Sequence, residues 1–134
     1  MRVSSSALCA LALLALAPAQ GLTAKTLDIY FIDVEGGQST LLVTPERQSF
    51  LVDTGWAGSG MPGSKPGDPS QSRDARRIVA AARDAGIKQI DYLLITHFHT
   101  DHDGGVVELA QLMPIRHFID HGTLPDAAQR DAAT

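Results

Sequence analysis

The sequence predicts one small α/β domain, and three observations support this class. The chain has 134 residues, a length typical of one domain, and its 44% apolar and 19% charged residues match ordinary globular proteins. Apolar segments come first as a meander, which is typical of neighbouring antiparallel strands. Further along the chain, apolar segments alternate with helical patterns, which is typical of a sheet packed against helices in layers.

Three strands are expected in the first part of this domain. Residues 26–34 carry apolar side chains at both odd and even positions, so we expect a strand buried on both faces. Gly36-Gly37 predicts a turn after it. Residues 39–44 and 49–53 are two further apolar segments, and Pro45-Glu46 between them predicts a hairpin.

A long loop and a helix are expected next. Residues 55–72 are rich in proline and glycine and predict an exposed loop, which at this length is usually functional or disordered. Ser72 can cap a helix over residues 73–85, and Gly86 is a typical stop. We expect the arginines of this helix to form its solvated face.

The remaining elements alternate between strand and helix. Residues 90–96 predict a central strand, residues 105–112 a short helix, and residues 115–120 a further strand. Asp103 is expected to be the cap of the short helix rather than a metal ligand.

Residues 1–19 have the pattern of a secretory signal peptide. Arg2 gives a basic start, an apolar run extends from Ala7 to Ala17, and Ala17-Pro18-Ala19 is a small-residue cleavage site. The run is shorter than the roughly 20 residues of a membrane-spanning helix, so we favour cleavage over an uncleaved anchor. Residues 20–134 would then be periplasmic or secreted, with no membrane attachment after cleavage. Cleavage would also remove Cys9, the single cysteine.

The net negative charge of the chain argues against nucleic acids and anionic membranes as partners. Acidic residues outnumber basic ones 15 to 11, and the formal net charge is −4. Such a chain has no general attraction for nucleic acid or anionic membranes, so we expect no stable nucleic-acid partner. A phosphate-bearing substrate would need a local feature, such as a metal ion, to hold it.

A histidine cluster follows the apolar strand at residues 90–96. Positions two apart in an extended chain face the same way, so His97 and His99 can converge on one metal ion. Asp101 and His102 lie at the turn into the next helix and can reach a second ion nearby. Imidazole and carboxylate suit zinc, or manganese or iron where more oxygen ligands join. The alternative is a polar surface loop in which the histidines occur by chance.

Two further residues are candidates for substrate contact. His121 ends the last strand, at the edge where α/β sheets place ligands, and the alternative is a solvated turn histidine. Trp56 opens the long loop and can either wall a substrate pocket or serve as a buried anchor. His117 alternates with apolar neighbours, and we expect it to be structural.

The pattern His-x-His-x-Asp-His after a buried strand resembles the signature of the metallo-β-lactamase fold superfamily. Residues 51–55 (LVDTG) resemble its upstream strand, which ends in an aspartate that supports the metal site. Residues 29–42 are similar to the opening strand of its competence-protein branch, although Glu35-Gly36-Gly37-Gln38 stands in place of the usual order. The resemblance runs from Leu27 to Gly122. It implies an αββα sandwich of which residues 20–134 form the first half, the N-terminal sheet with its helices.

The resemblance implies an exported zinc-dependent hydrolase with two zinc ions in the complete domain. His97 and His99 would bind the first ion, and Asp101 and His102 the second. Metal-bound hydroxide would be the nucleophile, and Asp101 would also hold it in line for attack. Asp53 would orient a ligand rather than bind metal, with an ordinary turn aspartate as the alternative. The substrate would be an ester, lactone, lactam, thioester or phosphodiester.

A non-catalytic fragment or metal-binding half-domain is the alternative function. The complete site of the superfamily takes further ligands from the second half of the sandwich, whereas only His117 and His121 follow His102. We therefore expect these residues alone to bind at most one metal ion weakly and to expose an apolar sheet face. The missing half, or a dimer partner, would cover that face.

Overall fold

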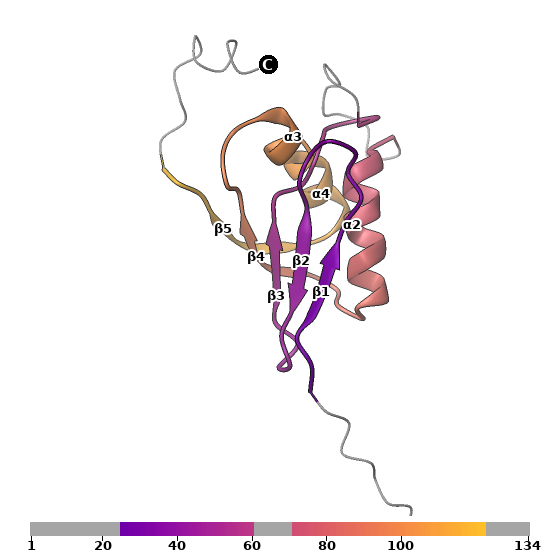
Figure 1. Ribbon diagram of the computed structural model, residues 1–134, viewed down its shortest axis with the longest axis vertical. Coiled ribbons are helices and arrows are strands. Elements are labelled where there is room, and N and C mark those ends of the chain that lie inside the picture. Colours follow the sequence, from indigo (N-terminus) through magenta and orange to yellow (C-terminus); the bar gives the residue numbers. More distant parts are fainter. Residues whose placement is uncertain (1–24, 61–70, 123–134) are drawn as a thin grey trace, which may run out of the picture.

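The computed structural model describes residues 25–60 and 71–122, which form a five-stranded sheet with helices packed on one face (Figure 1). The strands are β1 (Asp28–Phe31), β2 (Thr40–Val43), β3 (Ser49–Val52), β4 (Ile90–Leu94) and β5 (Ile115–Ile119). The helices are α2 (Arg73–Asp84), α3 (Thr100–Asp103) and α4 (Val106–Leu112). The α/β class is confirmed, in agreement with the first half of an αββα sandwich. The predicted signal peptide lies outside the described residues.

The order of the strands in the sheet follows the chain, from β1 at one edge to β5 at the other. The pairs β1–β2 and β2–β3 are antiparallel, while β3–β4 and β4–β5 are parallel. Parallel neighbours need a crossover, which α2 supplies between β3 and β4, and α3 with α4 between β4 and β5. This arrangement brings the carboxyl ends of β3, β4 and β5 to the same edge of the sheet.

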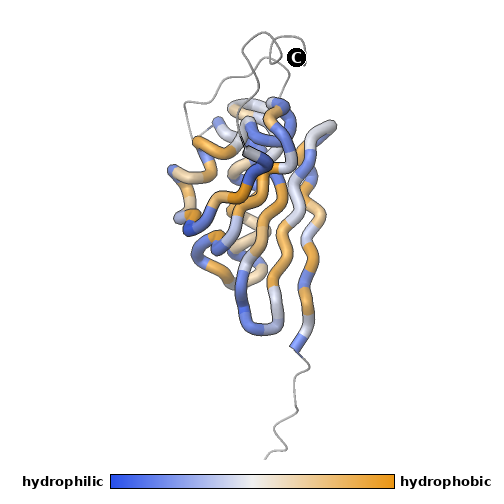
Figure 2. The backbone as a smooth tube through the Cα atoms, turned by 90° about the vertical axis from the view of Figure 1, so that its left-hand side faces the viewer, coloured by the Kyte–Doolittle hydropathy of each residue, from blue (hydrophilic) through white to orange (hydrophobic). Residues whose placement is uncertain are grey.

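The hydrophobic core lies between the sheet and the helices α2 and α4. Leu41, Leu51 and Leu93 are register partners on three adjacent strands, and all three are fully buried. Ile78 of α2 and Leu109 of α4 pack into the same cluster. Figure 2 shows the corresponding apolar stretches along the strands, with polar residues at the turns. Burial of these side chains provides the main driving force for docking the helices.

The ends of α2 agree only partly with the prediction. Gly86 follows the helix with a φ of 70°, the left-handed conformation that glycine adopts at helix ends. Ser72 occupies the N-cap position, but its side chain makes no cap hydrogen bond. No helix within residues 25–60 and 71–122 is long and apolar enough to cross a membrane.

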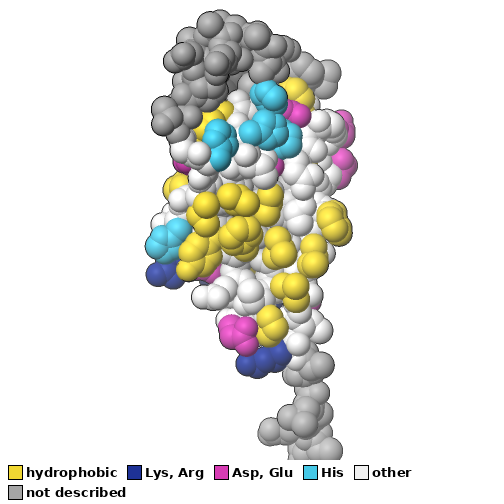
Figure 3. Space-filling model, turned by 60° about the vertical axis from the view of Figure 1, so that its left-hand side comes forward, with side chains coloured by type: hydrophobic (Ala, Val, Ile, Leu, Met, Phe, Trp, Pro, Cys, Tyr) yellow, Lys and Arg dark blue, Asp and Glu magenta, His cyan; other side chains and the backbone are white. Residues whose placement is uncertain are grey.

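The face of the sheet opposite the helices is apolar and open (Figure 3). Strand register places Ile29, Leu42, Phe50 and Tyr92 in one row across this face, ending at His117, whose ring stacks on Tyr92. The prediction that residues 26–34 are buried on both faces is therefore wrong for the described part of the chain. Only the side of β1 that faces the helices has a covering layer, and Phe31 on the open side is 85% exposed.

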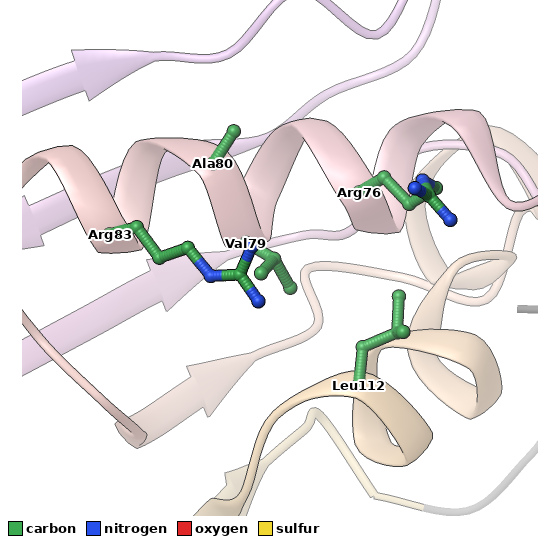
Figure 4. Close-up of a pocket in the computed structure, with 5 residues that line it drawn as sticks. All are labelled: Arg76, Val79, Ala80, Arg83 and Leu112. Carbon is green, nitrogen blue, oxygen red and sulfur yellow. The ribbon is translucent and has the colours of Figure 1, made fainter. Parts of the chain in front are cut away.

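A shallow groove of about 290 Å³ lies between α2 and α4, on the helical side of the molecule (Figure 4). Its walls carry two arginines over a small apolar floor, formed by Arg76, Val79, Ala80, Arg83 and Leu112. These residues belong to the helical layer alone. The groove is therefore separate from the histidine cluster.

The Asp91 carboxylate joins β3 to β4 near the start of both strands, at the opposite end from the cluster at residues 97–102. It accepts hydrogen bonds from the Ser49 backbone N–H at 2.9 Å and from the Gln89 side-chain amide at 2.8 Å. Burial works to raise the pKa of Asp91, but these hydrogen bonds and the nearby Arg116 guanidinium outweigh it and hold the pKa below its usual value. Asp91 therefore stabilises the folded chain in its ionised form.

This lowered pKa predicts a specific dependence of stability on pH. The contribution of Asp91 is fully present above the unfolded-state pKa of about 3.9 and is lost as the pH falls through the lower folded-state value. We expect Asp91→Asn to lower the free energy of unfolding at pH 7 by roughly 1–2 kcal/mol, and by less at pH 3. Urea denaturation at both pH values measures this, with Glu46→Gln as the exposed control. Parallel pH profiles for Asp91→Asn and the parent chain would contradict the assignment.

Candidate metal centre

The site residues predicted from the sequence follow three parallel strands at one edge of the sheet. Asp53 comes directly after β3, the segment from His97 to His102 follows β4, and His121 follows β5. Figure 3 shows histidine side chains gathered at one end of the molecule, next to the open apolar face. Ligand sites of α/β sheets lie at this edge because parallel strands carry their carboxyl ends there together.

His97 and His99 form the first donor pair. His97 Nε2 lies 2.8 Å from His99 Nδ1, and the ring centroids are 4.5 Å apart. Two nitrogens bound to one tetrahedral zinc at about 2.0–2.1 Å would be separated by about 3.3 Å. The pair can therefore accept an ion after a shift of about half an ångström.

Asp101 and His102 form the second donor pair. His102 Nε2 lies 3.6 Å from Asp101 Oδ2, close to the separation that two ligands of one ion would have. The rings of His97 and His102 are 4.0 Å apart between centroids, so the two pairs are neighbours. Both residues of the second pair are only partly exposed, with side-chain exposures of 21% and 28%.

Each pair supplies two donors, whereas a tetrahedral zinc site takes four ligands. Within residues 25–60 and 71–122, no group of three His, Cys, Asp or Glu side chains is arranged to hold one ion. The residues present fit the chemistry of a zinc site as two partial ligand sets. A complete site would need further ligands from beyond the described residues.

Asp53 contacts Thr96 and His102 and is completely buried. Its Oδ2 lies 2.8 Å from His102 Nδ1 and accepts a hydrogen bond from the Thr96 hydroxyl at 2.7 Å, while its Oδ1 accepts from the Thr96 backbone N–H. A carboxylate on the inner nitrogen of an imidazole fixes the ring and leaves the outer nitrogen for a ligand bond. The φ of Asp53 is 58°, a left-handed conformation that aspartate tolerates better than most residues.

Thr96 is a site residue that sequence reasoning did not identify. Its hydroxyl touches Asp53 and also lies 3.0 Å from His97 Nδ1. The available signal was its position, directly before the first histidine and at the end of a buried strand. A hydroxyl there can reach the strand-end aspartate of the neighbouring parallel strand.

The backbone of the segment from His97 to His102 is held by two neighbouring turns. Thr54 donates its N–H to the His102 carbonyl at 2.7 Å, and Gln38 donates its N–H to the Asp101 carbonyl at 3.1 Å. Gly37 packs so tightly here that a Cβ atom would lie 2.4 Å from the Asp101 carbonyl oxygen. The orientation of Asp101 and His102 therefore depends on the chain around residues 37–38 and 54.

Two buried carboxylates fix the segment that follows Asp53. Asp74 accepts the Trp56 backbone N–H at 2.9 Å, and Glu108 accepts the Gly58 backbone N–H at 3.0 Å. Both carboxylates are 0% exposed. The side chain of Trp56 is only partly exposed, so its alternative roles as pocket wall and anchor both stay predictions.

Arginines of α2 hold the loop between β1 and β2. Arg73 pairs with Glu35 at 2.8 Å and with Asp74 at 2.7 Å, while Arg77 lies 3.2 Å from Asp33. Arg73 and Arg77, expected on the solvated face of this helix, are partly exposed there and also pair with acidic side chains. Acidic side chains from the loop lie within reach of the first turns of α2, which the local sequence pattern does not reveal.

The structure places the remaining candidates, His121, His117 and Asp103, in three different environments. His121 is exposed at the same edge as the histidine cluster, with its ring 4.8 Å from that of Phe98. His117 instead lies within β5 on the open face. Asp103 is the last residue of α3, and Gly105 occupies the N-cap of α4, so the expected cap role of Asp103 is wrong. Burial raises the pKa of the Asp103 carboxyl.

Comparisons with known proteins point to one family. The sequence matches the Metallo-beta-lactamase superfamily over residues 33–133, a range that contains both donor pairs and Asp53. It is also similar to the lactamase-like protein aptB of Emericella nidulans, with 37% identity over 95 residues. That alignment covers 71% of this chain but only 26% of the relative, so the chain spans about a quarter of that protein.

The glycine pair before Gln38 allows a test of the backbone contact. We expect Gly37→Ala to destabilise the chain by roughly 1–3 kcal/mol, because its Cβ would collide with the Asp101 carbonyl. Gly36 has a φ of 84° and open space around its Cβ position, so Gly36→Ala should cost only about 1 kcal/mol. Urea denaturation gives both values, and amide spectra should show shifts at residues 100–103 for Gly37→Ala alone. Equal effects of the two variants would argue against the close packing.

Proposed function

This chain belongs to the metallo-β-lactamase superfamily, and from this we propose that it forms the N-terminal part of an exported, metal-dependent hydrolase. The observation that carries the proposal is the pairing of His97 with His99 and of Asp101 with His102 at the carboxyl edge of the sheet. Membership of the superfamily supports hydrolase-like chemistry, and the donor set supports zinc as the metal.

The four donors have distinct tasks in the proposed site. His97 and His99 would hold one zinc ion, and Asp101 and His102 would hold a second. Manganese or iron remains compatible if oxygen ligands complete the sites. When bound, zinc would act as a Lewis acid and activate water for attack on a scissile carbonyl or phosphoryl group.

The protein would position these groups before substrate arrives. Asp53 holds the inner nitrogen of His102, which directs the outer nitrogen toward Asp101. Asp101 is the proposed catalytic residue, because a carboxylate has two acceptor oxygens and one can orient the attacking water while the other is engaged. Preorganised groups of this kind need little rearrangement at the moment of reaction.

The substrate class we propose is an ester, lactone, lactam, thioester or phosphodiester. These share an electrophilic centre bonded to an oxygen that becomes negatively charged during attack, which a cationic site would stabilise. His121 and Trp56 are the proposed substrate contacts, since His121 lies at the same edge and Trp56 begins the loop after Asp53. The acidic net charge of the chain favours no nucleic-acid partner.

A second half of the sandwich is proposed to complete the domain. The open face of the sheet exposes Ile29, Phe31 and Tyr92, a surface that soluble proteins usually cover. The aligned relative is about four times as long as the aligned segment. We propose that the covering layer also brings the remaining metal ligands, supplied by further chain or by a partner chain.

The alternative is a non-catalytic metal-binding half-domain. It is favoured by the limited donor set, because two donors for each ion bind more weakly than three or four. The two functions differ in turnover, so zinc-loaded protein screened on lactam, lactone and bis-nitrophenyl phosphate substrates distinguishes them.

Histidine substitutions test the metal assignment. We expect His97→Ala and His99→Ala to weaken zinc binding by at least about tenfold and to remove any hydrolysis, because each loses a ligand of the first ion. Equilibrium dialysis followed by elemental analysis measures the bound zinc. His117→Ala is the matched control, since this histidine lies within β5 on the open face. Zinc binding unchanged in both His97→Ala and His99→Ala would refute the proposed ligands.

Export has its own test. Protein isolated from the native host should begin at Gln20, because the small-residue pattern at residues 17–19 directs cleavage after Ala19. Mass spectrometry of the intact protein determines this N-terminus. Soluble protein that still begins at Met1 would contradict the export proposal.

A further inference from the structure

The donors and acceptors around Thr96 determine which atom donates in each of a series of hydrogen bonds that runs from Asp53 to His99. Thr96 Oγ1 lies 2.7 Å from Asp53 Oδ2 and 3.0 Å from His97 Nδ1. An ionised carboxylate can only accept, so the single hydroxyl proton must point to Asp53. The hydroxyl oxygen is then left as an acceptor toward His97.

The next two contacts follow from the first. His97 Nδ1 must carry a proton to donate to Thr96, and in a neutral imidazole this leaves Nε2 without one. His97 Nε2 then accepts from His99 Nδ1, which lies 2.8 Å away. The donor-to-acceptor direction of every hydrogen bond in this series therefore follows from the buried carboxylate of Asp53.

His102 is set by the same carboxylate along a second branch. Its Nδ1 lies 2.8 Å from Asp53 Oδ2 and donates to an ionised carboxylate, which in a neutral imidazole leaves Nε2 unprotonated on the side of Asp101. The two branches meet at Asp53, and the Thr96 hydroxyl oxygen also lies 3.5 Å from His102 Nδ1, at the limit of a hydrogen bond. Removing the Thr96 hydroxyl breaks the branch to His97 but leaves the much shorter contact of His102 with Asp53 in place.

We propose that Thr96 is a positioning residue which, by relaying the acceptor character of Asp53, holds His97 in the tautomer with a bare Nε2 that can serve as a ligand. Its purpose rests on the proposed metal site, but the tautomer itself does not require a metal ion. Thr96 thereby fixes the tautomer of His97, just as direct contact with Asp53 fixes the tautomer of His102. One buried carboxylate orients a histidine of each donor pair.

The tautomers can be measured without metal. We expect ¹⁵N resonances of the imidazoles at pH 8.5 to show protonated Nδ1 and bare Nε2 for both His97 and His102. Thr96→Val should change the His97 pattern toward a mixture of tautomers and leave His102 as it was. Thr96→Ser keeps the hydroxyl and should restore the parent pattern. Thr40→Val, at a threonine whose hydroxyl accepts only from Gln38 in the described structure, is the matched control.

Zinc binding gives the functional readout on the full chain. Isothermal titration with Zn²⁺ should show ten- to hundredfold weaker binding for Thr96→Val, and values within about threefold of the parent for Thr96→Ser and Thr40→Val. Thr96 is exposed and its backbone N–H still reaches Asp53 in every variant, so the fold should persist. Unchanged amide spectra away from the site check this.

The outcomes separate the inference from the proposed function. A parent chain with protonated His97 Nε2, or a Thr96→Val variant with the parent tautomer, would overturn the role of Thr96. Zinc affinity that falls equally in Thr96→Val and Thr96→Ser would also overturn it, because the hydroxyl would then be irrelevant. A parent chain with the stated tautomers but no zinc binding would refute the metal site while leaving the hydrogen-bond chain in place.

Discussion

The backbone contact between the turn after β3 and the segment from His97 to His102 is the constraint on which the rest of the proposed site depends. The Thr54 N–H donates to the His102 carbonyl, and the Gly105 N–H donates to the Gly55 carbonyl. These two hydrogen bonds join the turn after β3 to the segment that follows β4. Gln38 adds a third contact through the Asp101 carbonyl. Because the carbonyls of two proposed ligands are fixed, their side chains leave the backbone in defined directions. A loose surface loop would lose this order to conformational entropy.

The supports of this contact come from buried charges rather than from apolar packing alone. Asp74 and Glu108 hold the chain just beyond Gly55, and Asp53 holds it just before. Buried carboxylates are costly unless they receive hydrogen bonds, and each of these accepts from a backbone N–H. The site is thus stabilised by the same groups that would destabilise the core if their partners moved away.

Much of the fold could be predicted from the sequence, because hydrophobic periodicity and strand ends are local signals. Residues 49–53 and 90–96 predict strands, and the polar residues after them predict an edge with ligands. The roles of Thr96, Asp74 and Glu108 could not be predicted in this way, since their partners lie 18 to 50 residues away along the chain. The exposure of one side of β1 could not be predicted for a related reason. Apolar residues on both faces of a strand indicate that both faces will be buried. They do not indicate which part of the protein packs on each face.

Amide hydrogen exchange tests whether the segment from His97 to His102 is held in place by its neighbours. We expect the amides of Thr54, Gln38 and Gly105 to exchange as slowly as those of Leu51 and Leu93 in the central strands, because all of them would open only with the core. Exchange of these three amides as fast as that of the hairpin turn at residues 46–48 would contradict it. The histidines would then lie on a segment that opens independently of the sheet.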